Sequence, residues 1–144
     1  MTQPAHEPLT DEEWQWIFDR LGEAAEIGMD VADVVSIEAR YDEVVHAIER
    51  GEAPEGTAEE LIDVAGIALG EHLRQATGTR WAIFVDGDGS GLCLWEGPPE
   101  HRTLFPQATV ANRVQRRETG WIRAFAAATA QRLGEGRGPG EAHG

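Results

Sequence analysis

The sequence predicts an α+β fold with three N-terminal helices, a small antiparallel sheet of two or three strands, and two C-terminal helices. Three observations lead to this prediction. Apolar residues recur at the helical period of three or four positions over residues 10–77. Two short apolar runs then flank a glycine-rich turn, and helical spacing returns after Pro106. We expect one domain over residues 10–133, with the helices covering one face of the sheet.

The first helix is predicted to begin at Thr10. Thr10-Asp11-Glu12-Glu13 is a capping box, in which the threonine hydroxyl accepts from the Glu13 amide and the Glu13 carboxylate reaches back. Apolar residues follow at helical spacing, and Gly28 is expected to end the helix. They are Trp14, Ile17, Phe18, Leu21 and Ala25. Residues 1–9 are predicted to be disordered.

The second and third helices are predicted from caps of the same kind. Asp30 is expected to cap a helix that runs to about Arg50. Thr57-Ala58-Glu59-Glu60 repeats the capping-box pattern and should start a helix that Gly78 closes. Each cap precedes apolar residues at helical spacing, so both helices are expected to be amphipathic.

One side of the third helix lacks bulky side chains. Gly66 and Gly70 are four residues apart, so they lie on the same side. We expect this side to pack closely against the sheet or another helix. It is interpreted as a packing device and not as a membrane dimer motif.

A β-hairpin is predicted after Gly78. Residues 81–85 and 92–95 are apolar, and residues 86–91 between them are rich in turn formers. Residues 102–105 are a candidate third strand, which Pro106 ends because proline lacks a backbone donor.

Two helices are predicted near residues 107–118 and 121–133, separated at Gly120. Residues 134–144 are low in complexity and rich in glycine, which predicts a disordered tail. The prediction is therefore a single domain between two disordered ends.

Charge is distributed unevenly along the chain. Residues 1–72 carry 19 carboxylates and three arginines, whereas residues 73–144 carry seven carboxylates and nine arginines. The formal net charge of −14 would repel nucleic acid overall, so we expect no nucleic-acid partner. An acidic surface of this kind is suited to attracting a basic protein.

Composition and the opening residues set further expectations. No apolar run approaches 18 residues, which predicts no membrane span. The opening residues are neither basic nor apolar, so we expect no secretory signal and a cytoplasmic location. Cys93 is the single cysteine, so no internal disulfide forms, and we expect no metal or other cofactor.

Four residues form a candidate ligand site. Glu71, His72, Asp86 and Asp88 would supply carboxylates and an imidazole if they converged at the sheet edge. The structural alternative is favoured for His72, since it follows Ala65 and Leu69 along the apolar side. It predicts a partly buried histidine that bonds to the backbone. No nucleophile elbow, phosphate loop or nicotinamide fingerprint is present, which favours a non-catalytic protein.

A basic cluster is the candidate partner site. Arg113, Arg116 and Arg117 follow helical spacing and would form one positive face. The structural interpretation is solvation, or ion pairing with the acidic helices of the same molecule. The functional interpretation is contact with an acidic partner or with the acidic half of a second copy, so the chain is expected to be a monomer or a homodimer.

The order of short motifs between residues 67 and 117 resembles a known family. Ala68-Leu69-Gly70-Glu71 lies on a helix, and Trp81 opens a strand. Leu104-Phe105-Pro106 then leads into a helix with Val110-Ala111-Asn112-Arg113-Val114. This order resembles the small bacterial proteins grouped as domain of unknown function 3806. The resemblance covers about a third of the chain and implies a compact α+β domain, with no activity or catalytic residues to carry over.

The favoured functional hypothesis is a non-catalytic protein-binding module with a basic protein partner. An immunity- or antitoxin-like role fits this hypothesis by analogy of charge, because small acidic proteins can neutralise basic toxins. The alternative is a small-ligand-binding protein or hydrolase with a site near His72 and the 86–91 turn.

Overall fold

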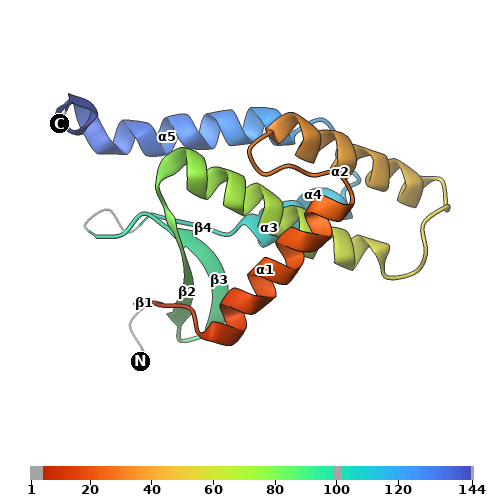
Figure 1. Ribbon diagram of the computed structural model, residues 1–144, viewed down its shortest axis with the longest axis horizontal. Coiled ribbons are helices and arrows are strands. Elements are labelled where there is room, and N and C mark those ends of the chain that lie inside the picture. Colours follow the sequence, from red (N-terminus) through yellow and green to blue (C-terminus); the bar gives the residue numbers. More distant parts are fainter. Residues whose placement is uncertain (1–4, 99–101, 144) are drawn as a thin grey trace.

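The computed structural model of this chain describes residues 5–98 and 102–143, with side chains as far as Leu133. In these residues, five helices and one antiparallel sheet of four strands form an α+β fold (Figure 1). The helices are α1 (Asp11–Glu26), α2 (Val34–Glu49), α3 (Thr57–Thr77), α4 (Pro106–Gln115) and α5 (Ile122–His143). The strands are β1 (Ala5–Glu7), β2 (Arg80–Asp86), β3 (Gly89–Trp95) and β4 (Thr103–Leu104), paired in that order. The predicted class is confirmed, and the sheet has four strands where two or three were predicted.

Helix α1 begins with the predicted capping box. The Thr10 hydroxyl accepts from the Glu13 amide at 3.2 Å, and the Glu13 carboxylate accepts from the Thr10 amide at 2.8 Å. The apolar stripe is divided between core and surface. Ile17 is buried, whereas Trp14 and Phe18 are 37% and 57% exposed. These two rings stack on each other at 5.9 Å and leave an aromatic surface on α1.

The caps of α2 and α3 differ from the prediction. Asp33, not Asp30, caps α2, because the Asp30 carboxylate accepts the amide two residues on within the preceding turn. The cap of α3 is Gly56. The Thr57 hydroxyl donates to the Pro54 carbonyl at 2.7 Å and so does not form the predicted box. In both places a local turn uses the side chain that a cap would need.

The small-residue side of α3 packs closely against its neighbours, as predicted, and it meets both the sheet and another helix. A Cβ atom at Gly66 would lie 2.9 Å from Cα of Gln107 in α4. A Cβ atom at Gly70 would lie 2.9 Å from Cζ2 of Trp81 in β2. Neither approach leaves room for a methyl group. The two glycines therefore let α3 lie against α4 and the sheet together.

Strands β2 and β3 form the predicted hairpin. Asp86 pairs with Gly89, so a two-residue turn joins the strands, and the pairing continues without interruption to Arg80 and Trp95. Two-residue turns match the twist of antiparallel strands and are rich in glycine and aspartate. Strand β4 pairs with the end of β3, which confirms the candidate third strand.

Strand β1 lies in the segment that was predicted to be disordered. Ala5, His6 and Glu7 pair with the second half of β2, and the His6 ring stacks on Trp95 at 4.2 Å. A strand of three residues is too short to show an alternating pattern in the sequence. Its partner strand therefore determines its structure. Residues 1–4 lie outside the described residues.

The C-terminal helices differ in length from the prediction. Helix α4 ends at Gln115 instead of continuing to Glu118, because Arg117 has a φ of 57°, which a right-handed helix does not allow. Helix α5 continues to His143, although residues 134–144 were predicted to be disordered. Extending a helix costs less than nucleating one, and the packed first turns of α5 provide the nucleus. Residue 144 lies outside the described residues.

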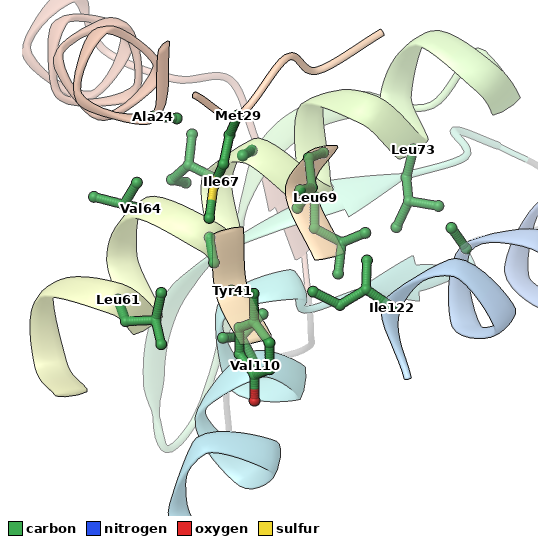
Figure 2. Close-up of a cluster of buried hydrophobic side chains, with 14 of the residues drawn as sticks. Ala24, Met29, Tyr41, Leu61, Val64, Ile67, Leu69, Leu73, Val110 and Ile122 are labelled. Atoms are coloured by element: carbon green, nitrogen blue, oxygen red, sulfur yellow. The ribbon is translucent and has the colours of Figure 1, made fainter. Parts of the chain in front are cut away.

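The core is centred on α3, which contacts the other four helices (Figure 2). Tyr41 of α2, Val110 of α4 and Ile122 of α5 are fully buried in it. The Tyr41 hydroxyl donates to the Glu118 carbonyl at 2.9 Å, so this buried polar group is satisfied. Among the described helices, none is long and apolar enough to cross a membrane.

Candidate functional site

The four predicted ligand residues do not form one site. Glu71 accepts a hydrogen bond from the indole N–H of Trp81, near the start of β2, at 3.1 Å. Asp86 and Asp88 lie at the hairpin turn, at the other end of the same strand. At about 3.3 Å per residue, roughly 16 Å of strand separates the two ends. The turn carboxylates therefore lie too far from Glu71 to share a small ligand with it.

His72 has the structural role that the sequence favours, and Cys93 is a core residue. The His72 Nδ1 atom is 2.7 Å from the Val31 carbonyl oxygen, and the residue is half-buried, as predicted. Cys93 is fully buried in β3, and burial raises the pKa of its thiol to about 11. A thiol with this pKa stays protonated at neutral pH and is a poor nucleophile.

Glu71 is the centre of a completed hydrogen-bond network. Arg74 donates to both of its oxygens, at 2.8 and 2.6 Å, and Gln75 donates at 3.0 Å. Burial disfavours the Glu71 carboxylate, but the donors of Arg74, Gln75 and Trp81 outweigh this effect and hold its pKa below the ordinary value. The charge is thus paired and its oxygens are occupied, so Glu71 fixes the positions of Trp81 and Arg74.

The arginine cluster does not form the predicted helical face. Helix α4 ends at Gln115, so Arg116 and Arg117 lie beyond it. Arg113 and Arg116 both pair with Glu118, at 2.5 and 3.5 Å. The Arg117 guanidinium donates to the carbonyl three residues before it. The cluster therefore makes local contacts, and its ion-pair partner is Glu118 instead of the acidic helices.

A groove of about 390 Å³ lies between α1, α2 and α3; we call it the acidic groove. Its apolar residues are Ile27, Val44, Leu61 and Val64, and its carboxylates are Glu23, Glu26 and Glu60. Ile27 is 45% exposed and Val44 is half-buried, whereas Leu61 and Val64 are buried beneath them. Glu26 and Glu60 are exposed and form no ion pair with a basic side chain of the described residues, whereas Glu23 pairs with Arg20. The groove combines an apolar floor with a negatively charged rim.

A larger hollow of about 570 Å³ lies between α1, β1 and the first half of β2; we call it the aromatic hollow. Its aromatic side chains include Trp14, Phe18, Trp81 and Trp95. The Arg80 guanidinium also lines it and lies over the Trp95 ring, 5.6 Å from the centroid. The sequence does not reveal this hollow, because Trp14 and Phe18 follow the spacing of an apolar stripe and β1 is too short to show an alternating pattern.

Comparison with known families identifies part of the chain. A family model described as "Domain of unknown function (DUF3806)" matches residues 40–125. This chain belongs to that family. No curated protein and no solved structure matches the chain.

The region that matches DUF3806 supplies one wall of the acidic groove and one wall of the aromatic hollow. Leu61 and Val64 of the acidic groove lie in it, as do Trp81 and Trp95 of the aromatic hollow. Helix α1 precedes the matched region and supplies the opposite walls. The acidic groove and the aromatic hollow therefore form where α1 packs against the DUF3806 domain.

Proposed function

We propose that this protein is a non-catalytic binding module that holds a basic, amphipathic segment of a protein partner in the acidic groove. The observation that carries the proposal is the apolar floor with carboxylates at its rim. An amphipathic helix laid in such a groove would place apolar side chains on Ile27 and Val44. Its lysines or arginines would face Glu26 and Glu60.

The charge around the groove supports the same function. Residues 1–72 carry 19 carboxylates, and among the described residues only four of these pair with an arginine. Those four are Glu23, Glu43, Glu52 and Glu71. The remaining negative charge would attract a basic partner and raise its association rate. A basic toxin met in the cytoplasm is one partner with this chemistry, which would make the protein immunity- or antitoxin-like.

The proposal is tested with a synthetic amphipathic peptide of leucine and lysine, and with a twin in which every lysine is glutamine. Calorimetry should detect binding of the lysine peptide, and its affinity should fall as salt is raised. The double variant Glu26→Gln/Glu60→Gln should bind it about fivefold more weakly, since two exposed ion pairs contribute about 1 kcal/mol together. Ile27→Ser should weaken both peptides, because it removes apolar surface and no charge.

A matched control separates the groove from the general charge of the protein. Glu12→Gln/Asp88→Asn removes the same charge from exposed residues that do not line the groove. At near-physiological salt, where the screening length is about 8 Å, this variant should keep its affinity. Equal losses in the two double variants, or no binding of the lysine peptide to the natural protein, would contradict the proposal.

A further inference from the structure

Half of one edge of β2 is left without a partner strand. Strand β1 pairs with Ile83, Phe84 and Val85, but β2 begins three residues earlier, at Arg80. The chain leaves the sheet after Glu7, and the next residue is a proline, which cannot donate a backbone hydrogen bond. The uncovered residues 80–82 line the aromatic hollow. The hollow therefore adjoins a strand edge that has no partner strand, where Trp81 and Ala82 are 4% and 3% exposed and Arg80 is exposed.

The hairpin shows which backbone groups face this edge. Residues that flank a two-residue turn, here Asp86 and Gly89, form a hydrogen-bonded pair, and bonding toward β3 then alternates along the strand. Ala82 and Arg80 consequently bond toward β3. The N–H and C=O of Trp81 point the other way, into the hollow, and no backbone group of the described residues bonds to them there. A strand edge of this kind is a template for pairing with another chain.

The two sides of the open edge differ in chemistry. A residue that paired with Trp81 would place its side chain on the same side as Trp81, beside the exposed Trp14 and Phe18 of α1. The next residue would point to the opposite side, where Arg80 lies over Trp95. An apolar side chain suits the first position, and an anionic one suits the second.

Arg80 provides the positive charge at this edge. It is exposed and forms no ion pair with a carboxylate of the described residues, although the chain as a whole is strongly acidic. Arg74 also lines the hollow, but Glu71 neutralises it. Glu7 lies at the rim and pairs with Ile83, so its side chain is on the other side of the sheet from Arg80.

We propose that an extended peptide from a protein partner adds to the edge of β2 by pairing with Trp81. Its apolar side chain would occupy the aromatic hollow, and a carboxylate on the adjacent residue would pair with Arg80. This recognition is strand addition, in which main-chain bonds hold the ligand and side-chain pockets select it. It uses different residues from the acidic groove and does not depend on the function proposed for that groove.

The test uses a blocked pentapeptide, acetyl-Thr-Glu-Phe-Glu-Thr-amide. Glutamate on both sides of phenylalanine lets either strand direction place a carboxylate near Arg80. Titration into the isotopically labelled protein should shift the amide signal of Trp81 and the indole signals of Trp14 and Trp95. Two twin peptides complete the set: one has glutamine in place of glutamate, and the other has an N-methyl group on phenylalanine. The N-methyl twin should bind about tenfold more weakly, because it loses one backbone bond and leaves its partner unpaired.

Two variants of the protein test whether the positive charge of Arg80 contributes to peptide binding. Arg80→Gln should weaken the glutamate peptide severalfold and leave the glutamine peptide unchanged, whereas Arg123→Gln, an exposed arginine outside the hollow, should alter neither. The absence of saturable shifts up to about 1 mM peptide would overturn the proposal. So would equal affinities for the N-methyl peptide and its parent. Because Glu26→Gln/Glu60→Gln should not affect this peptide, failure here is distinct from failure at the acidic groove.

Discussion

The substitution Gly70→Ala would place a methyl group against the ring of Trp81. The added Cβ would lie 2.9 Å from Cζ2, nearer still to Cη2, and 3.1 Å from Cγ of Pro106. Trp81 is 4% exposed and its indole N–H is bonded to Glu71, so the ring cannot swing away freely. Overpacking of this kind costs about 1–3 kcal/mol, and alanine returns about 1 kcal/mol through its better helix propensity. Because ring atoms lie inside normal contact distance, we expect a net loss of about 1–2 kcal/mol.

The same substitution at Gly22 is the matched control. Gly22 lies within α1, is exposed, and a Cβ there would have no atom within 4 Å. Gly22→Ala should therefore stabilise the protein by about 0.5–1 kcal/mol through helix propensity alone. The difference between the two variants isolates the packing of α3 against the sheet, at about 1.5–3 kcal/mol.

Both variants can be measured by urea unfolding, followed by far-ultraviolet circular dichroism and by tryptophan fluorescence. The free energy of unfolding should fall for Gly70→Ala and rise for Gly22→Ala, with unchanged dependence on urea. Equal stabilisation by the two substitutions would refute the close approach of α3 to Trp81. Coincident transitions by the two probes establish the two-state unfolding on which these free energies depend.

Three further predictions concern single residues. Glu71→Gln should lower the free energy of unfolding by about 1–3 kcal/mol at neutral pH. Because the pKa of Glu71 is lowered in the fold, its carboxylate stabilises the protein above the unfolded pKa and loses this effect as pH falls through the folded pKa. The difference between the variant and the natural protein should therefore shrink below pH 4.5, and urea midpoints across pH measure it. Cys93 should react slowly with a thiol reagent in the native protein and rapidly in urea, because burial raises its pKa to about 11; comparable rates would contradict this. Thr10→Ala should lower the free energy of unfolding by about 1 kcal/mol through loss of the capping box, and no change would mean that α1 does not depend on it.

Local patterns predicted the parts of the fold that depend on neighbours in the sequence. The capping box at Thr10 needs residues three apart, and the hairpin needs two apolar runs around a turn. The spacing of Gly66 and Gly70 predicted a close approach and left open whether the partner was the sheet or a helix, and the structure shows both. The same reasoning predicted the backbone bond of His72 from the apolar side of α3.

The functional surfaces depend on contacts that the sequence does not reveal. The aromatic hollow needs β1, which is three residues long, and it needs Trp14 and Phe18 to face solvent although their spacing predicts a buried stripe. The predicted arginine face fails through the backbone of one residue, because Arg117 has a positive φ and ends helical spacing there. Each of these features is set by tertiary pairing or by a single dihedral angle, to which periodicity is insensitive.

Helix α1 contributes side chains to both the acidic groove and the aromatic hollow. Its last turn brings Glu23 and Glu26 to the acidic groove, and its first half brings Trp14 and Phe18 to the aromatic hollow. The helix contributes just Ile17 and Ala24 as fully buried side chains, so most of its surface remains available for these walls. Since the DUF3806 match covers residues 40–125, that domain supplies strands β2, β3 and β4 and the central helix α3 on which α1 rests. The binding surfaces proposed above thus arise from packing an acidic, aromatic helix on a scaffold whose own residues provide Trp81, Trp95 and Arg80.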